Sequence, residues 1–349
     1  MSNEFIHRLR SATRILVKGQ TKSPLRVISA ITPEEVEEAK FFFPLDKFFI
    51  FGHARSGTTL LTRLVRLHPK VHCNYQAHFF TRKPFLESLV ASEEIGEWLT
   101  RQSNRWNRGE DLSPAVLRAS ADFILERDAH RAGKGSKGCI VGDKSPNSLV
   151  DGDAVRRMVK VYPDARLVFI IRDGRDAVVS HRFQTFIERP QHLTSESQKI
   201  RQDFIDDPEP FLTGQRSIFT EEAIYQAAVD WSHNINDTIQ AAHQLINDHF
   251  YTLRYEDILA QTWETMSQLW RFLGVDPQIE GLQHTVDSEM GRNPDAAWQK
   301  QKATEIADSL QKGKYGTWRE LFTNRDRMVF KQNAGKTLID WGYETDNKW

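Results

Sequence analysis

The stretch GHARSGTT, residues 52–59, constrains the fold more than any other part of the sequence. It follows the apolar run KFFIF and precedes TLLTRLVRLH, whose leucines recur at helical spacing. A glycine-rich turn between a buried strand and a helix brings backbone N–H groups and the positive end of the helix dipole to one point. The sequence therefore predicts an anion-binding loop of the phosphate-loop type.

This loop lacks the lysine that nucleotide-hydrolysing enzymes carry, because position 58 is a threonine. In those enzymes the lysine holds the β- and γ-phosphates, and the next Ser or Thr holds Mg²⁺ beside an acidic strand-end residue. The nearest acidic candidate is Asp143, and Lys144 follows it directly. We therefore expect a nucleotide with a single 5′-phosphate and no metal, with Arg55 supplying a fixed charge from inside the loop.

Apolar runs alternate with helical segments at short intervals along the chain. This alternation predicts an α/β fold with a central, mostly parallel sheet flanked by helices on both faces. Ligands bind such sheets beyond the carboxyl ends of the strands, and basic residues follow three of the expected strands there. The expected strands are 47–52, 139–144, 165–172 and 249–255, and the basic residues are Arg55, Lys144 and Arg172.

Length and composition fit one large domain with a short extension. Of the 349 residues, 39% are hydrophobic and 27% are charged, which is ordinary for a globular protein. We expect an N-terminal helical extension over 1–46 and a single domain over 47–349. The polar, proline-containing stretch 185–222 is expected to be a long loop that acts as a lid or substrate loop.

Global properties exclude several classes of partner. The formal net charge is zero, so nothing predicts binding to nucleic acid, and no apolar stretch is long enough to span a membrane. The basic amphipathic segment 5–19 either packs against the domain or associates peripherally with a membrane. Cys73 and Cys139 fit neither a disulfide framework nor a zinc site, and they predict a reducing, cytoplasmic location.

A second candidate anion site is IIRDGRDAVVSH, residues 170–181. Arg172 leaves the expected strand, and Ser180 lies two helical turns further on. Asp173 and Asp176 are expected to cap the helix and to pair with Arg175. Taken alone, this cluster fits a structural set of salt bridges as well as it fits an anion site.

Four segments together resemble sulfotransferases that use 3′-phosphoadenosine-5′-phosphosulfate (PAPS). FIFGHARSGTTLLTRL resembles their 5′-phosphosulfate loop, and IIRDGRDAVVSH resembles their motif for the ribose 3′-phosphate. KGKYGTWRELFT (312–323) is similar to the segment that folds over that 3′-phosphate. RYEDIL (254–259) is similar to the segment whose tyrosine approaches the adenine. The four segments occur in the family's order.

The resemblance implies transfer of a sulfuryl group from PAPS to a hydroxyl or, as the less favoured acceptor, an amine, with release of 3′,5′-bisphosphoadenosine (PAP). It implies no metal, and a small-molecule, carbohydrate or lipid acceptor. Lys144 would act on the leaving oxygen or the sulfuryl group, with an ion pair to Asp143 as the structural alternative. The residues implied at the cofactor are Arg55, Ser56, Gly57, Thr58, Thr59, Leu60, Arg172, Ser180, Tyr255, Lys312, Gly313 and Lys314.

The general base is the part that the resemblance leaves open. Related carbohydrate and tyrosine sulfotransferases carry glutamate where this sequence has Gln76, and an amide cannot accept the proton. In a strand, His78 would face the same side as Gln76, and the ordinary pKa of histidine suits the role. We predict that His78 is catalytic together with Arg55 and Lys144. His53, His181 and an acceptor that needs no base are the alternatives.

Two other functions remain as alternatives. A phosphate-loop kinase for nucleotides or small molecules would share the fold, but the missing lysine and the second anion motif count against it. A non-catalytic protein that binds PAPS is conceivable because Gln76 replaces the expected glutamate.

Overall fold

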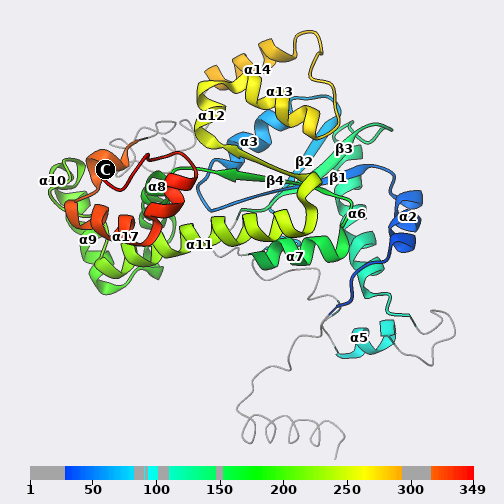
Figure 1. The fold of residues 1–349 in the computed structure, drawn as a ribbon, viewed down its shortest axis with the longest axis horizontal. Coiled ribbons are helices and arrows are strands. Elements are labelled where there is room, and N and C mark those ends of the chain that lie inside the picture. The colour runs from blue at the N-terminus through cyan, green and yellow to red at the C-terminus, as the bar shows by residue number, and fades with distance from the viewer. Residues whose placement is uncertain (1–27, 82–89, 91–92, 101–109, 147–151, 293–315) are drawn as a thin grey trace, which may run out of the picture.

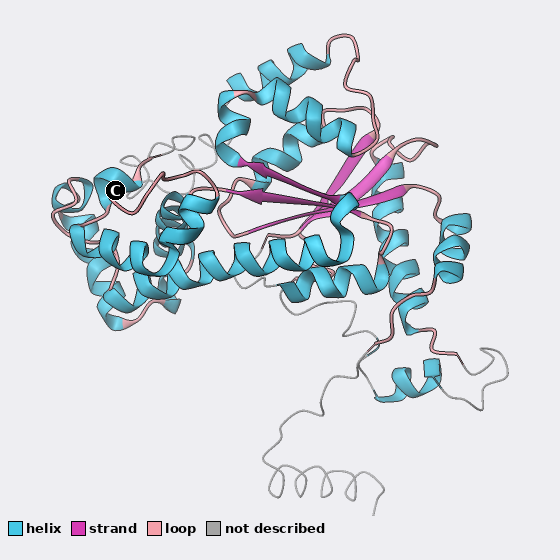
Figure 2. Cartoon of the chain, viewed as in Figure 1, coloured by secondary structure: helices cyan, strands magenta, loops and turns pink. Residues whose placement is uncertain are grey.

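The computed structural model describes residues 28–81, 90, 93–100, 110–146, 152–292 and 316–349. Within them, five parallel strands form one sheet in the order β2-β3-β1-β4-β5. Figures 1 and 2 show helices on both faces of this sheet, so the predicted fold class is confirmed. The strands are β1 Asp46–Gly52, β2 Val71–Tyr75, β3 Ile140–Lys144, β4 Arg166–Ile171 and β5 Phe250–Arg254.

The sheet separates two hydrophobic cores, and the side chains of β1 alternate between them. Phe49 and Phe51 pack in the first core, whereas Phe48 and Ile50 pack in the second. Because both faces are buried, the strand is apolar without interruption. The first core is covered by α6 Ser113–Arg131, α7 Gly152–Val161, α8 Gly174–Glu188, α11 Glu221–Ile246 and α17 Asn324–Asp340. The second is covered by α3 Thr58–Val65, α12 Tyr255–Ala260, α13 Thr262–Phe272 and α14 Leu282–Gly291.

The described part of the N-terminal extension packs against the domain. Helix α2, Pro33–Phe42, begins with a capping box in which Thr32 and Glu35 bond each other's backbone N–H. Lys40 pairs with Asp164 at 3.2 Å. The preceding segment 1–27, which contains the predicted amphipathic helix, lies outside the described residues. Helix α5, Glu93–Thr100, packs beside α6.

The stretch 185–222 is helical, so the prediction of a long loop is wrong. Helix α8 continues to Glu188 and is followed by η1 Pro190–His192, α9 Ser195–Asp206 and α10 Glu209–Leu212. Phe204 and Phe211 are buried and join the first core. Thr220 caps the long helix α11 by accepting from Ala223 N. The polarity of this stretch reflects the exposed faces of short helices, each of which buries few side chains.

The strand register gathers the expected ligand-binding residues at one edge of the sheet. Ile50 of β1 lies beside Lys144 of β3, and Gly52 lies beside Ile170 of β4. Ile171 in turn lies beside Arg254 of β5. The loop after β1, the end of β3 and the start of α8 therefore meet at the carboxyl edge, where parallel sheets bind ligands.

Candidate functional site

The loop between β1 and α3 has the backbone of an anion cradle. Gly57 has φ of +84° and Arg55 has φ of +71°, both in the left-handed region. At Gly57 a β-carbon would lie 2.1 Å from Tyr255 Cδ2, so both the dihedral angle and the packing require glycine. Tyr255, the first residue of α12, therefore lies directly against the loop.

The two candidate anion motifs form one cluster. Arg55 Nε donates to Ser180 Oγ at 3.1 Å, which joins the loop to the second turn of α8. Arg172 Nη1 donates to the backbone oxygen of Arg55 at 3.1 Å, and its guanidinium lies 4.8 Å from the centre of the Tyr255 ring. Five of the predicted residues, counting Gly57, are thus in mutual contact. No carboxylate pairs with Arg172 among the residues that the structure describes.

Two buried polar atoms in this cluster fit a missing anionic ligand. Ser56 Oγ and Arg172 Nε have no hydrogen-bond partner within the described chain, and buried polar groups are normally satisfied. Thr58 is buried and Thr59 is exposed at the first turn of α3, and half-buried Leu60 follows them. The donors and the glycine cradle therefore suit a phosphate or phosphosulfate group.

Lys144 reaches the same loop from β3. Its side chain is buried, and Nζ donates to Thr59 Oγ1 at 3.4 Å. The ammonium also lies 5.2 Å from the centre of the Tyr75 ring. The lysine therefore stands at the helix end of the cradle, where it adds a positive charge.

The two acidic residues at the start of α8, Asp173 and Asp176, bond different parts of the structure. Asp173 caps the helix and binds Arg175 Nη2 at 2.7 Å, as predicted. Asp176 accepts instead from the backbone N–H groups of Gly316 and Trp318, at 2.6 and 3.2 Å. This carboxylate holds the turn before α16, Trp318–Leu321, beside the cluster. Lys312, Gly313 and Lys314, which precede that turn, lie outside the described residues.

His78 is not on a strand, so the reason given for its orientation is wrong. Strand β2 ends at Tyr75, and Gln76 and His78 both adopt left-handed conformations, with φ of +57° and +52°. His78 Nδ1 lies 2.7 Å from Thr81 Oγ1, and Thr81 is buried. Half-buried His78 remains at the carboxyl edge, because its turn is bonded to the end of β3.

The alternative histidines differ in their surroundings. His53 is buried and bonds Ala54 O at 2.9 Å through Nδ1. Burial lowers the pKa of His53 to about 4. His181 lies on α8, and its side chain is only partly exposed. Desolvation, and then the charge of Arg55, lower the pKa of His181. Neutral His53 is therefore part of the loop scaffold.

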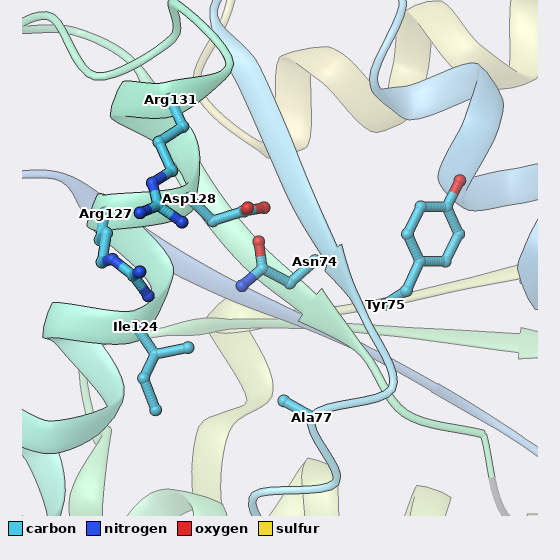
Figure 3. Close-up of a pocket in the computed structure, with 7 residues that line it drawn as sticks. All are labelled: Asn74, Tyr75, Ala77, Ile124, Arg127, Asp128 and Arg131. Atoms are coloured by element: carbon cyan, nitrogen blue, oxygen red, sulfur yellow. The ribbon is translucent and has the colours of Figure 1, made fainter.

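A pocket of about 320 Å³ opens behind the turn that follows β2. Figure 3 shows that it lies between the end of β2 and helix α6, with Tyr75 directed to the opposite side of the strand. The residues that line it are Asn74, Tyr75 and Ala77 from the β2 side and Ile124, Arg127, Asp128 and Arg131 from α6.

Comparison of the sequence with models of protein families decides to which family the chain belongs. The model described as "Sulfotransferase family" matches residues 47–279, which is most of the chain. The chain belongs to the Sulfotransferase family. The match includes the loop after β1, the Arg172–Ser180 motif and Tyr255, and it ends before residues 312–323.

The curated relatives of this sulfotransferase-family chain are distant. A protein-tyrosine sulfotransferase of Drosophila melanogaster is 24% identical over 260 residues, which are 74% of this chain and 44% of the relative. Protein-tyrosine sulfotransferase A of Caenorhabditis elegans is 29% identical over 132 residues, or 38% of this chain and 32% of the relative. The chain thus spans less than half of the length of these relatives.

Among solved structures, a mouse sulfotransferase complexed with PAP covers 92% of this chain and 99% of its own, with 14% identity and a TM-score of 0.46.

The relatives correct one expectation. The cytoplasmic location inferred from the cysteine count is contradicted by the relatives, which are protein-tyrosine sulfotransferases. In the described ranges, no helix combines the length and apolarity needed to span a bilayer. Nor do three His, Cys, Asp or Glu side chains gather as metal ligands in that part of the chain.

Sequence reasoning missed three residues that shape the site. The sequence predicts that Asp176 pairs with Arg175, but Asp176 bonds a turn that is 140 residues away. No sequence motif singles out Ser145 or Thr81, which bond the backbone and the side chain of His78. The proximity of Ser145 to Lys144 was the one available signal. No sequence pattern reveals which turn a buried side chain will bond.

Proposed function

We propose that this protein is a PAPS-dependent sulfotransferase that moves a sulfuryl group to a hydroxyl acceptor and releases PAP. One observation carries the proposal most of all: the loop after β1 and the Arg172–Ser180 motif, which are far apart in sequence, form one bonded cluster around Gly57. A nucleotide with phosphates at both the 5′ and the 3′ position needs two such sites close together. Membership of the family supports the same activity.

The cofactor is assigned to the residues of the cluster. Arg55 and the loop N–H groups around Gly57 hold the 5′-phosphosulfate, with the hydroxyls of Ser56, Thr58 and Thr59 as further donors and Leu60 beside them. Arg172 and Ser180 hold the 3′-phosphate, and Tyr255 flanks the adenine. Lys312, Gly313 and Lys314 extend the 3′-phosphate site from the segment that Asp176 anchors through Gly316 and Trp318.

PAPS supplies an activated sulfuryl group when it is bound. The chain's own part is to place fixed donors where negative charge grows on the leaving oxygen, which is the largest catalytic term in comparable transfers. Lys144 does this beside Thr59, and Arg55 does it from inside the loop. The donors are preorganised, because Arg55 is bonded to Ser180 and Lys144 to Thr59. Positioning the acceptor hydroxyl in line adds to the rate.

His78 is assigned as the general base. When Nδ1–H donates to Thr81 Oγ1, Nε2 carries the lone pair that takes the proton from the acceptor hydroxyl. The acceptor oxygen then forms its bond to sulfur as the bond from sulfur to the leaving oxygen breaks.

The acceptor is proposed to be a hydroxyl of a small molecule, carbohydrate or lipid. Because the curated relatives are protein-tyrosine sulfotransferases, a tyrosine in a peptide belongs to the same set of candidates. The domain is proposed to extend over 47–349.

Calorimetry with PAP and with 5′-AMP tests the cofactor assignment. PAP is expected to bind at least tenfold more tightly than 5′-AMP, which lacks the 3′-phosphate, and equally well in EDTA. The second test incubates the protein and ³⁵S-labelled PAPS in EDTA with a panel of phenols, sugars, lipid alcohols and tyrosine peptides. Binding of PAP without any transfer would favour a non-catalytic binding protein, and magnesium-dependent transfer of phosphate from ATP would favour a kinase.

A further inference from the structure

The turn that follows β2 has an unusual backbone. Gln76 and His78 both have positive φ, although neither is glycine, asparagine or aspartate. Such conformations are disfavoured for residues with a β-carbon, and they persist only where surrounding bonds impose them. Residues 76–78 therefore need an external support, which the structure places on the end of β3.

Three successive backbone N–H groups of this turn are bonded to three successive residues of the neighbouring segment. Gln76 N donates to Lys144 O at 2.7 Å, continuing the pairing of β2 with β3. Ala77 N donates to Asp143 Oδ1 at 3.0 Å, and His78 N donates to Ser145 Oγ at 2.9 Å. Two of the three bonds are thus made by side chains.

Asp143 lies at the centre of this arrangement. Its Oδ1 accepts from Ala77 N, while its Oδ2 accepts from the Ser145 hydroxyl. Ser145 Oγ can therefore use its lone pair for His78 N, so the carboxylate orients both side-chain bonds of the turn. Asp143 is 1% exposed and Ser145 is 2% exposed, which leaves water little access to either.

The candidate catalytic lysine, Lys144, is the middle one of the three residues that bond this turn. Lys144 stands between Asp143 and Ser145, and its side chain bonds Thr59 in the loop. The backbone around Lys144 is therefore fixed to the turn with His78, while its ammonium is fixed to the cradle. A shift of Asp143 would change the separation of the proposed base and the proposed electrophilic group.

Stability does not explain why a carboxylate stands here. Burial raises the pKa of Asp143 to about 6 against the effect of its hydrogen bonds, so the folded protein pays for the charged form. A neutral side chain of the same shape would avoid that cost. What this side chain supplies to the turn is therefore two acceptor oxygens at fixed positions, one for Ala77 N and one for the Ser145 hydroxyl.

We propose that Asp143 is a positioning residue of the transfer reaction: with Ser145, it fixes the Gln76–His78 turn to the end of β3 and so sets the position of His78 relative to Lys144. The inference rests on the proposed function for its catalytic consequence, but the bonding of the turn can be tested without it. Asp143 thereby has a role unlike that of the magnesium-binding aspartate of phosphate-loop kinases.

The test compares Asp143→Ala, Asp143→Asn and Ser145→Ala with the wild type. With an acceptor found in the panel, Asp143→Ala is expected to lower kcat about 100-fold while the Kd for PAP changes less than twofold. Asp143→Asn keeps an oxygen for Ala77 N and should recover at least tenfold of that loss. Asp326→Asn, which alters a buried capping carboxylate of α17, is the matched control and should leave kcat unchanged.

A spectroscopic measurement separates this inference from the proposed function. In protein labelled with ¹⁵N-histidine, the His78 backbone amide is expected to exchange slowly with solvent in the wild type. Exchange should be at least tenfold faster in Asp143→Ala and Ser145→Ala, and unchanged in Asp326→Asn. Unchanged exchange in the first two variants, or a parallel loss of PAP affinity and kcat, would overturn the inference. Failure of the wild type to bind PAP would instead count against the proposed function alone.

Discussion

The two ends of the sheet hold positive charges through different kinds of partner. At the amino end, Lys47 of β1 bonds Glu126 at 2.8 Å and lies 3.3 Å from Asp122. At the carboxyl end, Arg55 and Lys144 are held by hydroxyl groups and Arg172 by a backbone oxygen. Carboxylates bond the first cation, and neutral oxygens are among the partners of the other three. The difference teaches that the amino end stabilises the fold, whereas under the proposed function the carboxyl end receives the anionic cofactor.

The amino-end network extends beyond this lysine. Arg118 forms a two-pronged pair with Asp164, at 2.7 and 2.9 Å, and the Tyr162 hydroxyl donates to Asp122 at 2.8 Å. Each carboxylate therefore has at least one partner close to ideal distance, which is the condition under which buried charges are tolerated. The same condition predicts where substitutions will unfold the protein.

The largest expected effect is a loss of stability when a charge at the amino end of the sheet is removed. Lys47→Met removes the cation and leaves Asp122 and Glu126 without it, which should lower the free energy of unfolding by about 3–5 kcal/mol. Urea denaturation measures this change, and calorimetry on the folded variant should give an unchanged Kd for PAP. A loss of PAP affinity without a loss of stability would contradict the division between the two ends.

The next effect is a pH dependence that arises at the carboxyl end. The pKa of Asp143 is about 6 when folded, against 3.8 ordinarily, so the folded state holds this proton more tightly. The contribution of Asp143 to the free energy of unfolding should therefore fall as pH rises from about 4 to 6 and stay constant above. The rise in pKa corresponds to about 3 kcal/mol.

The difference between wild type and Asp143→Asn isolates this contribution. The variant should gain stability relative to the wild type by up to about 3 kcal/mol between pH 4 and 7, measured by urea denaturation across that range. His53, whose lowered pKa acts in the opposite direction, is present in both proteins and cancels. A difference that does not vary with pH would show that Asp143 titrates normally.

A third prediction compares two arginines at opposite ends of β4. Arg172→Ala should weaken PAP binding about 100-fold, because a charged, bonded partner of the anion is lost. Arg166→Ala, at the start of the strand, removes only a surface pair with Asp46 and should leave the Kd within twofold. Equal affinities in the two variants would place the cofactor elsewhere.

The smallest expected effect is a change in PAP affinity that tests the assignment of Ser180 to the 3′-phosphate. Ser180→Ala removes the hydroxyl that accepts from Arg55 Nε and is assigned to the 3′-phosphate. PAP affinity should fall about tenfold, in line with one or two hydrogen bonds, while 5′-AMP affinity is unchanged. Thr185→Ala, further along α8, is the control. An equal loss for both nucleotides would mean that Ser180 does not read the 3′ position.

The sequence predicts those parts of the structure in which local pattern and local geometry agree. The continuous apolar run before Gly52 and the helical leucines after Gly57 each specify a local conformation that packing preserves. The contacts of Arg55 with Ser180, and of Tyr255 with Gly57, could be expected only because resemblance assigns both motifs to one ligand.

Other features depend on tertiary contacts that local patterns do not encode. The stretch 185–222 looks like a loop, because each of its short helices buries few residues, such as Phe204 and Phe211. The conformation that follows β2 depends on another contact of this kind. The left-handed residues Gln76 and His78 are held by Asp143 at the end of β3 and by Ser145, the residue after it.

The loop that follows the central strand β1 contacts residues that lie far along the sequence, and this has a consequence during synthesis of the chain. The phosphate loop is synthesised early in translation. Ser180, which bonds Arg55, follows 125 residues later, and Tyr255, which packs against Gly57, is made later still. A nascent chain that has just exposed the loop therefore contains the cradle without the side chains that complete it. Loops closed over such distances form late in folding. Capture on immobilised PAP should thus select finished molecules over truncated ones, making cofactor binding a quality check on synthesis of the whole domain.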